Sequence, residues 1–196
     1  MVLRSFAKRI LRTKFLTTIF EGMHNGWKCH RYDQYRQNYD IHEDFLFNGD
    51  GILFYGDGEI VAKQDTYVGR YSQIQSVEDY NVVIGENCSI SHFIKIYTSN
   101  KLADQDLSQP DTKYSQGNVI IGDDVWIGAS VFITEDVEIG DNAVIGANSV
   151  VTRDIPSHTI AAGAPAKVQK FKSYTDEDFR KTIMEEYPES ISEQLS

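Results

Sequence analysis

The chain has 196 residues, with 19 basic and 29 acidic side chains and a formal net charge of −10. This length is enough for one domain with a sizeable core, and the acidic balance argues against nonspecific nucleic-acid binding, which needs a basic surface. The two cysteines, Cys29 and Cys88, lie far apart and form no Cys-x-x-Cys pair. We therefore expect neither a zinc knuckle nor a disulfide framework, and a reducing, cytoplasmic compartment is the simplest interpretation.

The first 20 residues are basic and amphipathic. Their basic residues are Arg4, Lys8, Arg9, Arg12 and Lys14, and their apolar residues are Leu3, Phe6, Ile10, Leu11, Phe15 and Ile19. This spacing predicts one face of a helix, while the charges recur too often for a signal peptide or a membrane span. We expect the helix to pack on the protein body or a neighbouring subunit, because exposed amphipathic faces usually find protein partners. The alternative is a weak contact of residues 1–20 with an anionic membrane surface.

Residues 21–50 are rich in aromatic and polar side chains. The aromatic residues are Trp27, Tyr32, Tyr35, Tyr39, Phe45 and Phe47. We interpret this stretch as irregular, with aromatics that cap the open end of a repeat array, since terminal repeats need capping. Residues 1–55 are thus predicted to form an N-terminal helical and irregular segment.

A six-residue period dominates the second half of the chain. Aliphatic residues occupy every sixth position, at Ile121, Ile127, Ile133, Ile139, Ile145 and Val151. This period fits neither a helix nor a simple strand, and a hexapeptide repeat indicates a parallel β-helix. One aliphatic residue per hexad would point to the axis, and small residues at the corners would let coils stack at about 4.8 Å.

The same pattern extends the predicted β-helix to residues 56–170. Earlier hexads run through Ala62, Val68, Ile74, Ile84, Ile90 and Ile96. The period is lost over residues 101–118, a polar stretch that we expect to be a functional loop, because long loops inside compact repeats usually are. Beyond the coils, residues 171–196 are predicted to hold a C-terminal helix with Thr175 as its N-cap.

The stretch IGDDVWIGASVFITEDVEIGDNAVIGANSVVTRDIPSHTIAAGAPAKVQK resembles the C-terminal half of the hexapeptide-repeat acyltransferases, in particular the galactoside, maltose and xenobiotic acetyltransferase branch. The resemblance is strong over residues 117–171 and fair over 56–101. It implies an all-β fold, a left-handed parallel β-helix of triangular coils. It also implies a homotrimer that binds acyl-CoA at each subunit junction, with the loop walling a neighbour's active site.

The resemblance places the coenzyme A site in the C-terminal half. Arg153, Lys167 and Lys170 are the only basic residues between Val119 and Lys170. They fall where the family contacts the phosphates of coenzyme A, and Lys and Arg are suitable charge partners for phosphate. Thr152 would help to shape the adenine pocket.

Three further residues match the family's contacts with the pantetheine arm and the thioester of acetyl-CoA. Ala129 and Ala147 are one full coil apart and should lie one above the other, leaving backbone amides open to a slender ligand. Trp126 stands where the family has a Trp beside the thioester. The alternative for Trp126 is packing at the trimer contact.

The acceptor site lacks an expected histidine. The sugar O-acetyltransferases keep their catalytic base in a motif I-Y-T-x-x-H, and here Lys101 stands at the last position of that stretch. A lysine of ordinary pKa is protonated and is no base. A second slot, I-x-H of the sugar-nucleotide N-acyltransferases, matches Ile90-Ser91-His92, so we predict His92 as general base. The alternative is a histidine that only packs at the trimer contact. Candidate substrate contacts are Tyr97, Asn100, Asp104 and Asp106.

These features predict an acetyl-CoA-dependent acetyltransferase. Its acceptor would be a hydroxyl or amino group of a sugar or nucleotide sugar, in bacterial surface polysaccharide synthesis such as O-antigen (lipopolysaccharide) or capsule. One alternative is a trimeric scaffold without activity. Another is a γ-type carbonic anhydrase on the same fold, which needs three histidines around zinc. His92 is the only histidine between residues 43 and 157, and His158 follows in a turn after Pro156, so we expect no metal.

Overall fold

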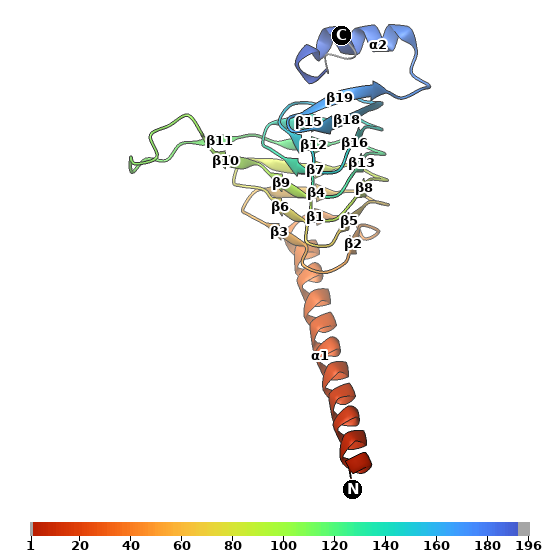
Figure 1. Cartoon of the computed structure of the whole chain (residues 1–196). Coiled ribbons are helices and arrows are strands. Elements are labelled where there is room, and N and C mark those ends of the chain that lie inside the picture. Colours follow the sequence, from red (N-terminus) through yellow and green to blue (C-terminus); the bar gives the residue numbers. More distant parts are fainter. Residues whose placement is uncertain (1, 192–196) are drawn as a thin grey trace. The chain divides into compact units, whose positions relative to one another are not determined.

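The computed structural model describes residues 2–191, and the side chains from residue 14 onward. The chain divides into two compact units, with the boundary between Asn38 and Tyr39. The first unit is a helix and the second a parallel β-helix (Figure 1). Among the described residues, no helix is both long and apolar enough to cross a membrane.

The first unit is one continuous helix, α1 (Val2–Asn38). It corrects the irregular stretch expected over residues 21–50, because the helix runs to Asn38 and the first strand begins at Asp40. No proline precedes Pro110, and the isolated Gly22 and Gly26 each cost only about 1 kcal/mol of helix propensity.

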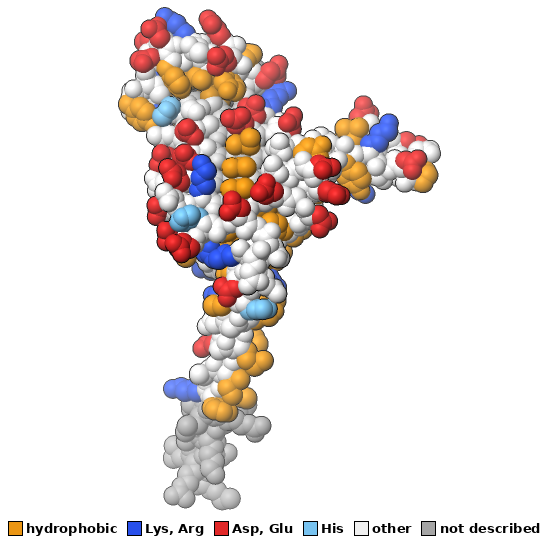
Figure 2. All heavy atoms as spheres, turned by 180° about the vertical axis from the view of Figure 1, so that it is seen from behind, with side chains coloured by type: hydrophobic (Ala, Val, Ile, Leu, Met, Phe, Trp, Pro, Cys, Tyr) orange, Lys and Arg blue, Asp and Glu red, His pale blue; other side chains and the backbone are white. Residues whose placement is uncertain are grey.

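The described side chains of α1 leave a run of apolar residues exposed. These residues are Phe15, Leu16, Ile19, Phe20, Met23 and Trp27. Figure 2 shows hydrophobic side chains along this part of the helix. The side chains of Leu3, Phe6, Ile10 and Leu11, which belong to the expected amphipathic face, lie outside the described residues.

The second unit is built from three sheets of mainly parallel strands that form the sides of the coils. The first sheet contains β1 (Asp40–Ile41), β4 (Glu59–Ala62), β7 (Asn81–Ile84), β12 (Val119–Ile121) and β15 (Val137–Ile139). The second contains β2 (Leu46–Asn48), β5 (Tyr67–Gly69), β8 (Ser89–Ile90), β13 (Trp126–Ile127), β16 (Val144–Ile145), β18 (Thr159–Gly163) and β19 (Ala166–Phe171). The third contains β3 (Leu53–Tyr55), β6 (Gln73–Gln75), β9 (Lys95–Tyr97), β14 (Phe132–Ile133) and β17 (Val150–Val151). The predicted β-helix is confirmed, although its strands begin at Asp40 rather than at residue 56.

The aliphatic residues of the hexads form the axial core. Ile90 pairs with Ile127 and Ile127 with Ile145 in successive coils, and each of the three is at most 1% exposed. At the start of the array, Phe45 and Phe47 pack edge to face with each other and with Phe54. The expected aromatic cap is therefore made by the first coil itself.

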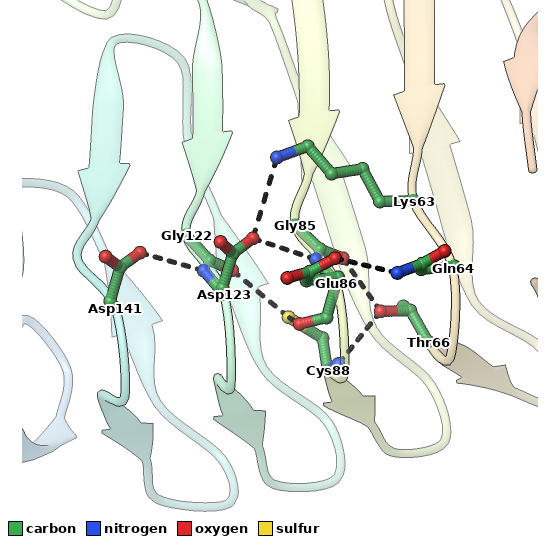
Figure 3. A network of polar contacts seen from close by, with 9 residues as sticks. All are labelled: Lys63, Gln64, Thr66, Gly85, Glu86, Cys88, Gly122, Asp123 and Asp141. Atoms are coloured by element: carbon green, nitrogen blue, oxygen red, sulfur yellow. Dashed lines mark hydrogen bonds and ion pairs between the residues drawn. The ribbon is translucent and has the colours of Figure 1, made fainter.

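Acidic and amide side chains hold the corner between the first and second sheets (Figure 3). The backbone N–H of Glu86 donates to the Asp123 carboxylate, and that of Asp123 donates to Asp141, both at 2.9 Å. Cys88 lies inside this corner, where its thiol donates to the Gly122 carbonyl at 3.1 Å and burial raises its pKa to about 11. These two carboxylates thus satisfy backbone donors of neighbouring coils.

The stretch predicted as a polar loop is an ordered hairpin. Strands β10 (Ser99–Lys101) and β11 (Tyr114–Gln116) pair antiparallel and project from the coils (Figure 1). The Gln105 side chain bridges the hairpin, because its amide donates to the carbonyl of Lys113 and its oxygen accepts from that residue's N–H.

The C-terminal segment closes the array. Strand β18 extends the second sheet and β19 folds back on it antiparallel. Helix α2 (Glu177–Glu186) follows, capped by Asp176 rather than by Thr175, because the Asp176 carboxylate accepts from the Phe179 N–H at 2.7 Å. The helix is shorter than predicted because a short 3₁₀ turn, Pro188–Ser190, follows it. As expected, Ile183, Phe179 and Met184 pack towards the body.

Candidate active site

One corner of the β-helix brings several of the predicted site residues into a single column. At the corner between the second and third sheets, Arg70, His92, Ala129 and Ala147 occupy equivalent positions in successive coils. The N–H of Asn148 donates to the Ala129 carbonyl and that of Ser130 to the His92 carbonyl, both at 2.9 Å. The structure therefore places Ala147 directly above Ala129, as the spacing predicted, and His92 one coil below them.

His92 is held against the preceding coil. Its Nδ1 accepts a hydrogen bond from the backbone N–H of Arg70 at 3.1 Å. The ring lies over Gly69, where an added Cβ would come within 2.2 Å of that nitrogen. Because Nδ1 is the acceptor, the neutral ring carries its proton on Nε2. The exposed part of this half-buried ring thus offers a donor.

A hollow lies beside this column on the third sheet. Its volume is about 550 Å³, and it is lined by Phe93, Lys95, Tyr97, Ser130, Val131 and Phe132. Tyr97 packs edge to face on Phe132, and its hydroxyl donates to the Gln73 side chain at 2.9 Å. Of the four predicted substrate contacts, Tyr97 is the one that lines this hollow.

The other three predicted contacts belong to the hairpin. Asn100 donates its side-chain amide to Glu135, and Lys101 lies beside it, exposed, opposite Tyr114. Asp104 is exposed near the hairpin tip. The Asp106 carboxylate accepts hydrogen bonds from Gln109 and Ser108, which stabilise the tip. The same bonds lower the pKa of Asp106 to about 2.

The three predicted phosphate contacts are divided between two places. Lys167 and Lys170 lie on β19, opposite Ala162 and Ile160 of β18, in the sheet that also carries the exposed Trp126. Arg153 and the exposed Thr152 lie instead at the corner between the third and first sheets. There the Arg153 guanidinium forms an ion pair with Glu189 at 2.6 Å.

The sequence interpretation missed Gly69, Arg70 and Tyr71. The axial partner of Ile90 in the coil below is Val68, which is more than three hexads away because residues 77–80 interrupt the period. A count of hexads therefore did not predict that Arg70 lies beneath His92. Within the part of the chain that the structure describes, no group of three His, Cys, Asp or Glu residues is placed to hold a metal ion.

Comparison with known proteins places this geometry in a family. The family model described as bacterial transferase hexapeptide (six repeats) matches residues 118–153. A maltose O-acetyltransferase of Clostridium difficile 630 is 32% identical, with coverage of 73% of this chain and 75% of that chain and a TM-score of 0.52. The chain belongs to the hexapeptide-repeat acyltransferases.

Two further relatives show how far this likeness reaches. Galactoside O-acetyltransferase of Escherichia coli K12 is 38% identical over 47% of this chain and 45% of its own length, so the chain spans about half of that relative. The N-acyltransferase AntD of Bacillus cereus shares 16% identity at a TM-score of 0.60, over 82% of this chain and 97% of that chain. That likeness shows the hexapeptide-repeat fold alone.

Proposed function

We propose that this chain transfers an acetyl group from acetyl-CoA to a hydroxyl or amino group of a sugar or nucleotide sugar. The observation that carries the proposal is the column of Ala129 and Ala147, with His92 at one end. Lysines on β19 lie in the last strand of the adjoining sheet. The names of the relatives support it, because they include galactoside and maltose O-acetyltransferases, and AntD was solved with coenzyme A and an amino-sugar nucleotide.

For the donor, we assign the small-residue column to the pantetheine arm and Trp126 to the thioester end. Lys167 and Lys170 would meet the phosphates, as charge partners on one strand. Arg153 would join them only by leaving Glu189. Thr152, its chain neighbour, keeps the adenine-pocket role proposed from the sequence.

For the reaction, the acceptor nitrogen or oxygen attacks the thioester carbonyl carbon, the C–S bond breaks and coenzyme A leaves as the thiolate. His92 was expected to take the acceptor's proton. With Nδ1 engaged by the Arg70 N–H, its Nε2–H can instead donate to the carbonyl oxygen as negative charge develops there. We assign His92 this donor role. The proton then passes from the acceptor to the departing thiolate, which favours an amine, because a neutral amine attacks without prior deprotonation.

The same proposal includes a homotrimer with the donor at the subunit junctions, a cytoplasmic reaction and a role in O-antigen or capsule synthesis. The exposed apolar residues of α1, together with the basic residues that precede them in the sequence, support a weak contact of this segment with a membrane surface. Co-sedimentation with lipid vesicles tests this contact: the protein should bind vesicles of anionic lipid and not those of neutral lipid.

Calorimetric titration with acetyl-CoA tests the donor half. We expect one site per chain, weakened several-fold by Lys170→Ala and by Lys167→Ala. Lys181→Ala on the exposed face of α2 is the matched control and should bind as the unchanged protein does. Absence of binding would overturn the proposal and favour the scaffold without activity.

A further inference from the structure

The corner below the donor column carries two aromatic rings that the fold does not require. Tyr71 and Phe93 occupy equivalent positions in successive coils, and both have left-handed backbone, with φ of 59° and 61°. Most other corners place Asp, Asn or Ser there, such as Asp124 and Asn148. Asn and Asp accept this conformation with little strain, whereas bulky residues in it cost on the order of 1–3 kcal/mol.

Burial does not explain the two rings. Tyr71 is 51% and Phe93 50% exposed, and they stack on each other with centroids 5.4 Å apart and an angle of 19° between their planes. A strained backbone therefore supports a flat aromatic surface that faces solvent. Strained positions that the surrounding structure maintains tend to occur at ligand sites.

The rings adjoin the hollow of about 550 Å³, because Phe93 is part of its lining. This volume lies within the range of small-ligand sites. Ser130 and Val131 also line it, and they directly follow Ala129 of the donor column. A molecule in the hollow would thus reach the corner where the acetyl group is proposed to arrive.

Local charge distinguishes this place from the rest of the coils. Residues 39–196 contain 11 basic and 27 acidic side chains. Lys95 nevertheless lines the hollow and Arg70 immediately precedes Tyr71, and both are exposed. Among the described residues, no carboxylate forms an ion pair with either side chain.

We infer that this surface, made of Tyr71, Phe93, Lys95 and Arg70, binds the nucleoside diphosphate part of a nucleotide-linked sugar. The inference rests on the proposed function and names its acceptor class. A nucleobase stacks on exposed aromatic rings with about 1–3 kcal/mol per base, and two unpaired cations attract a diphosphate. A free neutral sugar would use the rings but would give Lys95 and Arg70 no partner.

The test is calorimetric titration of the full chain with UDP and with dTDP, and separately with acetyl-CoA. We expect at least one nucleoside diphosphate to bind without competing with acetyl-CoA. Phe93→Asn should weaken that binding about tenfold, in line with the loss of one stacked base. It should also raise Tm, because Asn suits the left-handed corner. Lys95→Gln should weaken it as well, and the matched control Lys181→Gln should not.

The outcomes separate the two proposals. Binding of acetyl-CoA without either nucleotide would overturn this inference and leave the proposed function standing. Nucleotide binding without acetyl-CoA binding would overturn the proposed function, and the surface would then stand as a nucleoside diphosphate site without its role as an acceptor site. Competition between the nucleotide and acetyl-CoA, with both weakened by Phe93→Asn, would assign the surface to the donor and overturn the inference.

Discussion

The Nδ1 atom of His92 accepts the backbone N–H of Arg70 across the gap between two coils, at 3.1 Å. This bond orients the ring and sets which nitrogen carries the proton. The sequence motif does not say whether Nε2 acts as a base or as a hydrogen-bond donor. Because Nδ1 accepts the Arg70 N–H, Nε2 carries the proton and the geometry favours the donor.

Substitution of His92 tests the donor role. Loss of one donor to a developing oxyanion costs roughly 10²-fold in rate, so His92→Ala should lower kcat by about that factor. His92→Gln retains a side-chain N–H and should recover most of it. Steady-state acetyl transfer with both variants provides the measurement. A Gln variant as slow as the Ala variant would point to a base instead.

Gly69 is expected to be intolerant of any side chain. A Cβ there would lie 2.2 Å from the His92 Nδ1 and 2.7 Å from the Ser91 backbone. Gly69→Ala should therefore lower the free energy of unfolding by about 1–3 kcal/mol through overpacking, and displace His92. Gly146 occupies the same position in a later coil, two coils beyond Ser91. A Cβ there would lie 2.9 Å from its nearest neighbour, the Ala162 Cβ, so Gly146→Ala should be milder. Denaturant unfolding of both variants compares the effects, and equal losses would contradict this account.

The ion pair of Arg153 with Glu189 makes a prediction about affinity. If Glu189 competes with a phosphate for the guanidinium, Glu189→Gln should tighten acetyl-CoA binding several-fold, and Arg153→Gln should weaken it. Both side chains are exposed, so stability should change by less than about 1 kcal/mol. Unchanged affinity in both variants would leave Arg153 with the sole task of holding the C-terminal segment.

Cys88 should be unreactive in the folded protein. Burial raises its thiol pKa to about 11 from 9.0, so the neutral thiol is favoured, and its contribution to stability is present below pH 9 and is lost as pH rises through 11. At pH 8 a thiol reagent should modify the exposed Cys29 alone, and both cysteines after denaturation. Rapid modification of two thiols in the native state would show that the corner opens.

The sequence predicted those elements whose physics is local and periodic. The axial residues from Ile121 to Val151 follow from the hexad alone, because one aliphatic side chain per side fills a narrow core. Helix α1 was only partly predicted, because its aromatic residues were interpreted as an irregular cap of the repeat array. In the structure they belong to the helix, where Tyr32 and Tyr35 are neighbours.

The site was harder to predict because it depends on how coils stack. The motif at Ile90 identified His92 but not its partner Arg70, which belongs to a coil of different length. Likewise, the sequence predicted one phosphate-binding group made of Arg153, Lys167 and Lys170. In the structure the two lysines lie on β19, whereas Arg153 lies at another corner. Such separations follow from tertiary register, which a period alone does not encode.

From Ala62 onward to Val151, variation in coil length is confined to one corner. From Ala62 to Val151, each step from the first sheet to the second and from the second to the third is one hexad. Extra residues enter between the third sheet and the first, at residues 77–80 and in the hairpin between β9 and β12. That corner is a natural insertion point. A foreign hairpin grafted in place of residues 99–116 should therefore leave the axial register intact, because the stacked coils on either side do not depend on its length.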